Sequence, residues 1–217
     1  MSAALDDDAA LGRLINLSGK MRMLSHRIAL FLISSVGKAG ESSPDPRLAG
    51  SLDEFRDIHR TLKHGNAELG ISSKVIGMIS ASEALGAHAH KFIDSFVAQA
   101  EALMTARTGA NAEAFMELVA GPLLERLNAI TDHISATLNQ LHESQKTQAA
   151  ASERAVSEAL TAIENVSVNV RIIAINAATE AVRAGESGKG FAIIAQEIRR
   201  LSDQAGVLVQ SVRANLQ

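Results

Sequence analysis

Residues 172–201 decide the fold of this chain, and they read IIAINAATEAVRAGESGKGFAIIAQEIRRL. Three glycines within residues 184–190 separate two stretches in which small or apolar side chains recur at alternating intervals of three and four residues, as in coiled-coil helices. The first series comprises Val156, Leu160, Ile163, Ser167, Val170, Ala174, Ala177 and Ala181, and the second comprises Phe191, Ile194, Ile198, Leu201, Ala205, Leu208 and Val212. Two such helices joined by a glycine-rich turn predict an antiparallel helical hairpin. Because one hairpin has too little core, we expect it to pair with a second copy of the chain in a four-helix bundle.

The composition of the whole chain is that of an all-α protein. Of its 217 residues, 47% are apolar and only three are proline, and six phenylalanines supply the aromatic content of 3%. So few helix breakers favour long helices. The absence of cysteine excludes disulfides, thiolate metal sites and cysteine nucleophiles. A net charge of −3 with so few aromatics argues against nucleic-acid binding.

No arrangement of residues in the sequence suggests catalysis or cofactor binding. Residues 185–190 lack the Lys-Ser/Thr ending of a phosphate-binding loop, and no strand precedes them. The histidines that lie near one another in sequence (His59 and His64, His88 and His90) are spaced to fall on different helix faces. We therefore expect neither an enzyme nor a bound metal or cofactor.

The rest of the chain predicts further helices, over residues 9–38, 47–63, 74–106 and from 112 onward, with a kink or restart at Gly121-Pro122. Asp6, Asp7 and Asp8 are expected to precede the first helix, where negative charge is favoured. The composition changes near residue 148, so we expect an antiparallel four-helix-bundle domain over 9–147 and a hairpin domain over 148–217.

The sequence also predicts a soluble, cytoplasmic protein without a membrane span. The beginning of the chain is acidic where a signal peptide would be basic. The longest apolar run, residues 28–36, is about half of the ~20 residues that a membrane-spanning helix needs.

Residues 172–201 closely resemble the signalling tip of methyl-accepting chemotaxis proteins, which reads L-N-A-A-x-E-A-A-R-A-G-E-x-G-[RK]-G-F-A-V-V-A-x-E-[VI]-R-x-L. The resemblance implies a tip that contacts the chemotaxis histidine kinase and its coupling protein. By resemblance, the residues that pack receptor dimers into trimers are Asn176, Glu180, Arg183, Phe191, Glu197 and Arg199. Those that face the kinase or coupling protein are Ile172, Asn176, Glu186, Lys189 and Ile193. Periodicity alone supports only a helix reversal, with Glu180 and Arg183 as an intrahelical ion pair.

The chain departs from that family's pattern in three respects. Val182 replaces the usual alanine, and Lys189 stands where arginine is common. The two arms are far shorter than a full receptor stalk. The sequence also lacks a Glu-Glu methylation pair, so we expect no adaptational methylation.

The predicted first helix carries an unusual charge. Residues 9–38 contain five basic residues, namely Arg13, Lys20, Arg22, Arg27 and Lys38, and no acidic one, a bias that favours an anionic partner. The spacing of three and four residues predicts a buried stripe on this helix, formed by Leu11, Leu14, Ser18, Met21, Ser25, Ile28 and Leu32. Arg22 lies beside this apolar stripe, one turn from Gly19. Arg27 is rotated by about 140° from Arg22, so it can brace a neighbouring helix or reach the same site from another side. The alternative is that Arg22 forms a salt bridge with an acidic residue such as Glu54, Glu83 or Glu113.

Residues 14–27, LINLSGKMRMLSHR, resemble the first helix of PilJ-type sensor domains, which begins I-N-x-[SA]-G-x-x-R-M-L-S-x-R and is related to the sensor modules of nitrate/nitrite kinases. The resemblance implies that Gly19 and Arg22 of two subunits enclose one small anion, such as nitrate or nitrite, on the dimer axis. This suits the chemistry, because two facing guanidiniums repel each other until an anion lies between them. Leu17 stands where some nitrate sensors have lysine.

Together these features predict a soluble, dimeric, chemoreceptor-like transducer that senses a small anion and signals to a chemotaxis kinase complex. The alternative is a ligand-independent scaffold that co-assembles with longer chemoreceptors through its tip.

Overall fold

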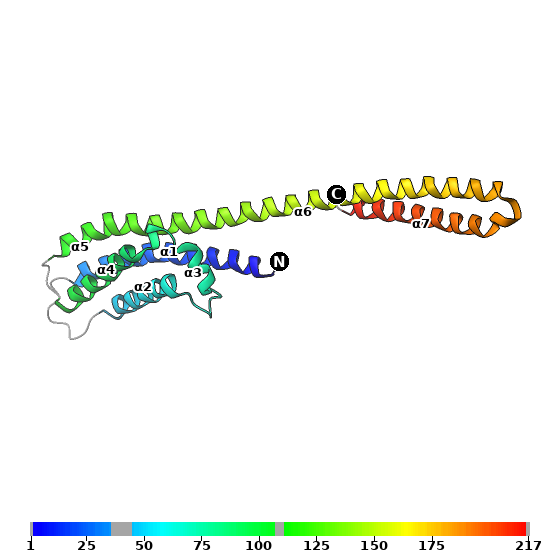
Figure 1. Cartoon of the computed structure of the whole chain (residues 1–217). Helices are drawn as coiled ribbons and strands as arrows, with labels where there is room; N and C mark the ends of the chain where they lie inside the picture. Colours follow the sequence, from blue (N-terminus) through cyan, green and yellow to red (C-terminus); the bar gives the residue numbers. More distant parts are fainter. Residues whose placement is uncertain (1, 36–44, 107–110, 216–217) are drawn as a thin grey trace. The chain divides into compact units, whose positions relative to one another are not determined.

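The computed structural model describes residues 2–35, 45–106 and 111–215, and these residues confirm the all-α prediction (Figure 1). They divide after Glu143 into two compact units, 1–143 and 144–217. The helix α6, Leu124–Arg183, is continuous across this division. The first unit and the hairpin of the second unit are therefore described separately.

The first unit is built on helix α1, Ser2–Ser35, which packs against α2 (Pro46–His64), α3 (Ser73–Ile79), α4 (Ala87–Ala106) and α5 (Ala112–Leu118). The buried stripe of α1 follows the predicted spacing of three and four residues and comprises Leu11, Leu14, Ser18, Met21, Ser25, Ile28 and Leu32. Phe55 of α2 and Phe96 of α4 fill the centre of the core, with ring centroids 5.0 Å apart. One apolar core thus holds these helices together.

The predicted beginning of the first helix is wrong. The first helix begins at Ser2 rather than at residue 9, so Asp6, Asp7 and Asp8 lie within α1 instead of before it. Asp7 pairs with Lys74, and Asp8 Oδ2 lies 3.2 Å from Nε2 of His142 on α6. The ion pair with Lys74 thus compensates the charge of Asp7 inside the helix. The predicted end of the first helix at Lys38 and the loop over residues 37–44 fall outside the described residues.

The single helix predicted over 74–106 is also wrong. The chain instead forms α3, a one-turn 3-10 helix η1 (Glu83–Leu85) and α4. The Ser82 hydroxyl accepts a hydrogen bond from the Ala84 amide, and Gly86 ends the 3-10 turn. The Ser82 cap and Gly86 therefore interrupt the stretch 74–106, which was predicted to be one helix.

At Gly121-Pro122 the chain forms a π-helical turn, η2 (Val119–Leu123), between α5 and α6. A proline has no amide hydrogen to donate and crowds the preceding turn, so the hydrogen-bond pattern widens there. The prediction placed a kink or restart at the same two residues.

The hairpin of the second unit consists of the C-terminal part of α6, the 3-10 turn η3 (Gly185–Gly188) and α7 (Lys189–Ala214) (Figure 1). Its internal seam consists mainly of small residues at heptad spacing: Leu160, Ser167, Ala174 and Ala181 on α6, and Gly188, Ala195, Ser202 and Val209 on α7. A side chain at Gly188 would meet the carbonyl oxygen of Ala181 at 2.0 Å, so only glycine allows this close approach.

The large apolar residues of α7 do not lie in this seam. The predicted series of α7 falls beside it, and most of its members are exposed: Phe191, Ile194, Ile198, Leu201, Leu208 and Val212. Helical geometry places Ile163, Val166 and Ile173 of α6 on the same side of the hairpin. We call this side the apolar flank.

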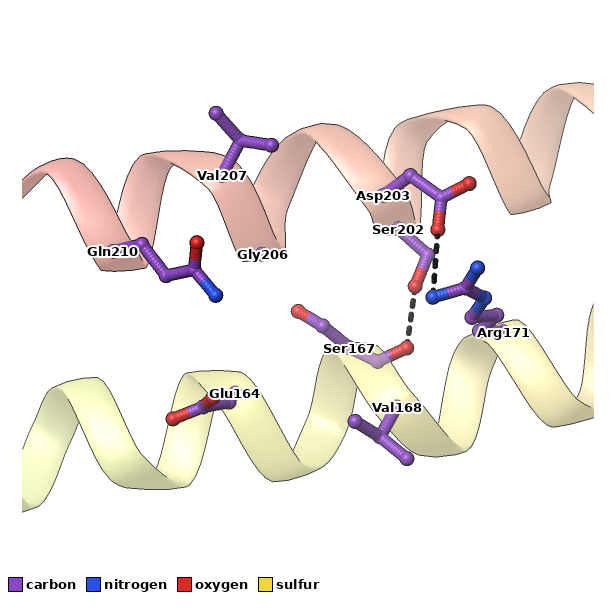
Figure 2. A pocket seen from close by; sticks show the side chains of 9 residues that line it. All are labelled: Glu164, Ser167, Val168, Arg171, Ser202, Asp203, Gly206, Val207 and Gln210. Atoms are coloured by element: carbon purple, nitrogen blue, oxygen red, sulfur yellow. Dashed lines mark hydrogen bonds and ion pairs between the residues drawn. The ribbon is translucent and has the colours of Figure 1, made fainter.

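The opposite side of the hairpin, which we call the polar flank, carries polar contacts between α6 and α7 next to exposed Val168 and Val207 (Figure 2). Arg171 of α6 pairs with Asp203 of α7 at 3.2 Å, and the Ser202 hydroxyl donates a hydrogen bond to the Ser167 carbonyl. A shallow depression of about 360 Å³ lies there, lined by these residues together with Glu164, Val168, Gly206, Val207 and Gln210. The hairpin thus has one polar and one apolar flank. Among the described residues, no helix combines the length and hydropathy that a membrane span requires.

Candidate functional sites: the hairpin tip and the Arg22 region

The hairpin tip owes its shape to two glycines. Gly185 adopts a φ of +58°, a left-handed conformation that side chains disfavour, and it follows the last turn of α6. Gly188 brings the start of α7 against Ala181 of α6. The residues 184–190 therefore form the tip at the predicted place.

The structure places all ten predicted tip residues on the exposed surface of this end of the hairpin: Ile172, Asn176, Glu180, Arg183, Glu186, Lys189, Phe191, Ile193, Glu197 and Arg199. Phe191 and Ile193 are 71% and 70% exposed. Large apolar side chains at this exposure, mixed with charged ones, are typical of a surface that binds another protein.

The ion pairs at the tip join residues three positions apart in the sequence and lie on the surface. Arg183 Nη1 lies 2.9 Å from Glu180 Oε1, the intrahelical pair that periodicity alone suggested, and Lys189 pairs with Glu186 at 2.7 Å. A hydrogen bond from Arg200 lowers the pKa of Glu197. Exposed pairs of this kind contribute little to stability, so these charges are available to a partner at small cost.

In the first unit, Arg22 hydrogen-bonds to a neutral side chain. Its Nη1 donates to Oδ1 of Asn128 on α6 at 2.8 Å, and its Nη2 would lie 3.6 Å from a Cβ at Gly19. The predicted alternative partners do not bind Arg22: among the described residues, no carboxylate of Glu54, Glu83 or Glu113 forms an ion pair with it. None of these three carboxylates therefore compensates the charge of the Arg22 guanidinium.

Gly19 and Arg22 are close together, and Arg27 is separate from them. Arg27 Nε donates to the Ser51 hydroxyl of α2 at 3.0 Å, and its Nη2 lies 3.6 Å from Glu54. Lys20 pairs with the same Glu54. Arg27 thus braces α2, one of the two roles considered for it.

An exposed stripe, interrupted by two half-buried glycines, runs along α1 beside the Arg22 guanidinium. Its members recur at alternating spacings of four and three residues and are Gly12, Asn16, Gly19, Met23, His26, Leu30 and Ile33. Met23 and Leu30 are 52% and 64% exposed. A helix with one buried and one exposed heptad stripe can pack against a second helix from outside the core.

The structure also brings together a group that sequence spacing could not reveal. His59 of α2 and His90 of α4 lie with Nε2 and Nδ1 3.0 Å apart, and His59 Nδ1 lies 3.3 Å from Asp94. Burial lowers the pKa of His59 to about 4, and it also lowers that of His90. His59 lies on α2, whereas His90 and Asp94 lie on α4. The spacing of residues in the sequence therefore gives no indication that these three side chains meet. Within the described ranges, no group of three or more acidic or histidine side chains could hold a metal ion.

Comparisons with known proteins agree with both resemblances. Residues 86–216 match the "Methyl-accepting chemotaxis protein (MCP) signalling domain" family, and residues 4–76 match "Type IV pili methyl-accepting chemotaxis transducer N-term". The first match begins before α6 and includes the whole hairpin as far as residue 216.

Curated relatives are similar over shorter stretches. Methyl-accepting chemotaxis protein McpC of Bacillus subtilis is 44% identical over 57 residues, which are 26% of this chain and 9% of that protein. Methyl-accepting chemotaxis protein McpN of Pseudomonas aeruginosa is 33% identical over 93 residues, which are 43% of this chain and 15% of that protein. The chain thus spans only a small part of the length of these relatives. No solved structure matches it. Because the signalling-domain match covers more than half of the residues, the chain belongs to the methyl-accepting chemotaxis protein signalling domain family.

Proposed function

We propose that this chain is a chemotaxis-type signal transducer whose hairpin tip engages a chemotaxis histidine kinase and its coupling protein, or the tips of other chemoreceptors. The family consists of non-enzymatic transducers. The observation that carries the proposal is the tip surface, where ten residues at the positions of the family motif are exposed together. Exposed Phe191 and Ile193 supply apolar contact, and the charged residues beside them supply specificity.

The proposal includes a homodimer. The apolar flank of the hairpin and the exposed stripe of α1 both leave heptad-spaced apolar residues uncovered in one chain, among them Leu208 at 66% exposure. A second copy would cover both surfaces. Two hairpins joined at their apolar flanks from Ile194 to Val212 would form a four-helix coiled coil and would leave Phe191 at the tip free for other partners.

The same arrangement supports a small-anion site at Arg22. A second α1 packed on the exposed stripe would bring a second Arg22 guanidinium near the first, with Gly19 leaving space between them. Two uncompensated guanidiniums favour an anion that accepts paired hydrogen bonds, such as nitrate or nitrite. We propose that the domain over residues 9–147 senses this anion and that the hairpin over 148–217 transmits the result.

A single substitution at the tip tests the kinase-complex proposal. Glu180→Ala removes a charge from the exposed surface together with an ion pair worth only about 0.3–0.5 kcal/mol, so the hairpin should keep its helical circular dichroism. Binding to purified coupling protein should weaken about tenfold in a calorimetric titration. Glu158→Ala, an exposed change on α6 far along the chain from the tip, should bind like the wild type. Equal binding by both variants would contradict the proposed role of the tip.

Thermal unfolding with and without anions tests the sensing proposal. At a hundred times the dissociation constant, nitrate should stabilise the dimer by roughly 2.7 kcal/mol and raise its melting temperature. Chloride at matched ionic strength controls for screening. Arg22→Ala should abolish the nitrate-specific shift without unfolding the protein, whereas Arg27→Ala should affect affinity less, because Arg27 braces α2. A wild type without any anion preference would favour the ligand-independent scaffold.

A further inference from the structure

The contact between α1 and α6 includes two half-buried polar pairs at the edge of the apolar core. The Ser18 hydroxyl lies 2.9 Å from the Thr131 hydroxyl, and Arg22 donates to Asn128 at 2.8 Å. Ser18 is completely buried. Residues 18 and 22 are one turn apart on α1, and residues 131 and 128 are nearly one turn apart on α6. The two pairs are therefore successive rungs between the helices, and they define one register of α1 against α6.

The two rungs differ in chemistry. The Ser18–Thr131 rung joins two hydroxyls, each of which can also donate to a carbonyl of its own helix, at Ile15 or Leu127. The Arg22–Asn128 rung joins a full positive charge to a neutral amide, which accepts one hydrogen bond but leaves the charge uncompensated. An anion offers the guanidinium a stronger acceptor than this amide.

We infer that Asn128 is a positioning residue that reports the occupancy of Arg22 to α6. The inference rests on the proposed anion site. A planar oxyanion that accepts from Nη1 and Nη2 attracts the guanidinium more strongly than the neutral Asn128 amide does, so it draws Nη1 away from Oδ1 although Nη1 has two hydrogens. Anion binding then exchanges a bond between α1 and α6 for a bond to the ligand. Since α6 continues without interruption to Arg183 at the tip, this exchange releases a restraint on the helix that carries the hairpin.

Two substitutions of Asn128 make opposite predictions. Asn128→Leu has a similar branched shape and no acceptor, so Arg22 loses its resident partner and nitrate should bind about tenfold more tightly to the full-length chain. Asn128→Asp has nearly the same shape but supplies an internal carboxylate, so nitrate should bind about tenfold more weakly. Asn139→Asp adds the same charge at an exposed position of α6 and should leave nitrate affinity within about twofold of the wild type.

The second readout is amide hydrogen exchange in residues 124–140 of α6. In the wild type, saturating nitrate should change exchange there, because it removes the Asn128 bond. In Asn128→Leu, nitrate should still bind but should leave α6 exchange unchanged, since that bond is already absent. If Asn128 had only a structural role, its substitution would not abolish the change in α6 exchange while nitrate still binds.

The outcomes distinguish this inference from the proposed function. If calorimetry shows no nitrate binding by the wild type, the anion site and the role of Asn128 both fail, while the tip proposal stands. If the wild type binds nitrate but the Leu and Asp variants shift its affinity in the same direction, the anion site stands and the role of Asn128 is overturned. Wild-type binding without any change in α6 exchange overturns it equally.

Discussion

At the scale of single residues, His59 illustrates how packing changes chemistry. It is only 4% exposed and lies between His90 and Asp94 of α4, with Lys63 and His64 nearby on its own helix. Burial opposes the charged form, and it outweighs the attraction of Asp94, so the pKa of His59 falls to about 4. At neutral pH the imidazole is therefore uncharged.

This depressed pKa makes stability depend on pH. The unfolded chain binds a proton at His59 near pH 6.5 and the folded chain does not, so the free energy of unfolding should decrease as pH falls from about 6.5 to about 4. The loss of stability that His59 causes across this range is about 3 kcal/mol. Urea unfolding across this range should show a shallower pH dependence for His59→Gln, whereas His88→Gln, at an exposed position, should follow the wild type. Equal slopes for all three proteins would refute the assignment.

At the scale of elements, helix period and helix ends were predictable to different degrees. The spacing of Leu11, Leu14 and Met21 predicted which face of α1 is buried, because a helix repeats every 3.6 residues whatever surrounds it. The beginning of α1 was not predictable from Asp6–Asp8, since pairing of Asp7 with Lys74 stabilises acidic residues inside the helix. The break between α3 and α4 was missed because the Ser82 cap and Gly86 compete locally with an apolar period that continues.

In the hairpin, too, the sequence predicted the helical period but not which face of α7 packs against α6. The large apolar residues of α7 follow a heptad series, yet the face that packs against α6 carries Ala195 and Ser202. Small residues form the internal seam because they let the two helices approach closely around Gly188. The series in the sequence therefore lies largely on an exposed surface, which we expect a second copy of the chain to cover.

At the scale of the whole molecule, we expect a dimer held partly by the apolar flank. Light scattering at micromolar concentration should give twice 22.9 kDa. Leu208→Lys places a charge on the apolar flank and should reduce the mass toward that of one chain. Val207→Lys alters an equally exposed neighbour on the polar flank, so it should leave the mass unchanged. A folded wild type that stays monomeric would remove both the dimer and the shared anion site.

The sequence by itself determined the all-α class, the position of the tip and the family, because these depend on local composition, on helical period and on a long motif around residues 184–190. It also singled out Gly19 and Arg22, through the resemblance of residues 14–27 to PilJ-type sensor domains and the lack of acidic residues over 9–38. Only the tertiary structure decided that Arg22 meets Asn128, that Arg27 meets α2, and that His59 meets His90. Each of these contacts joins helices far apart in sequence, and their register depends on the packing of the entire core, which no local pattern encodes.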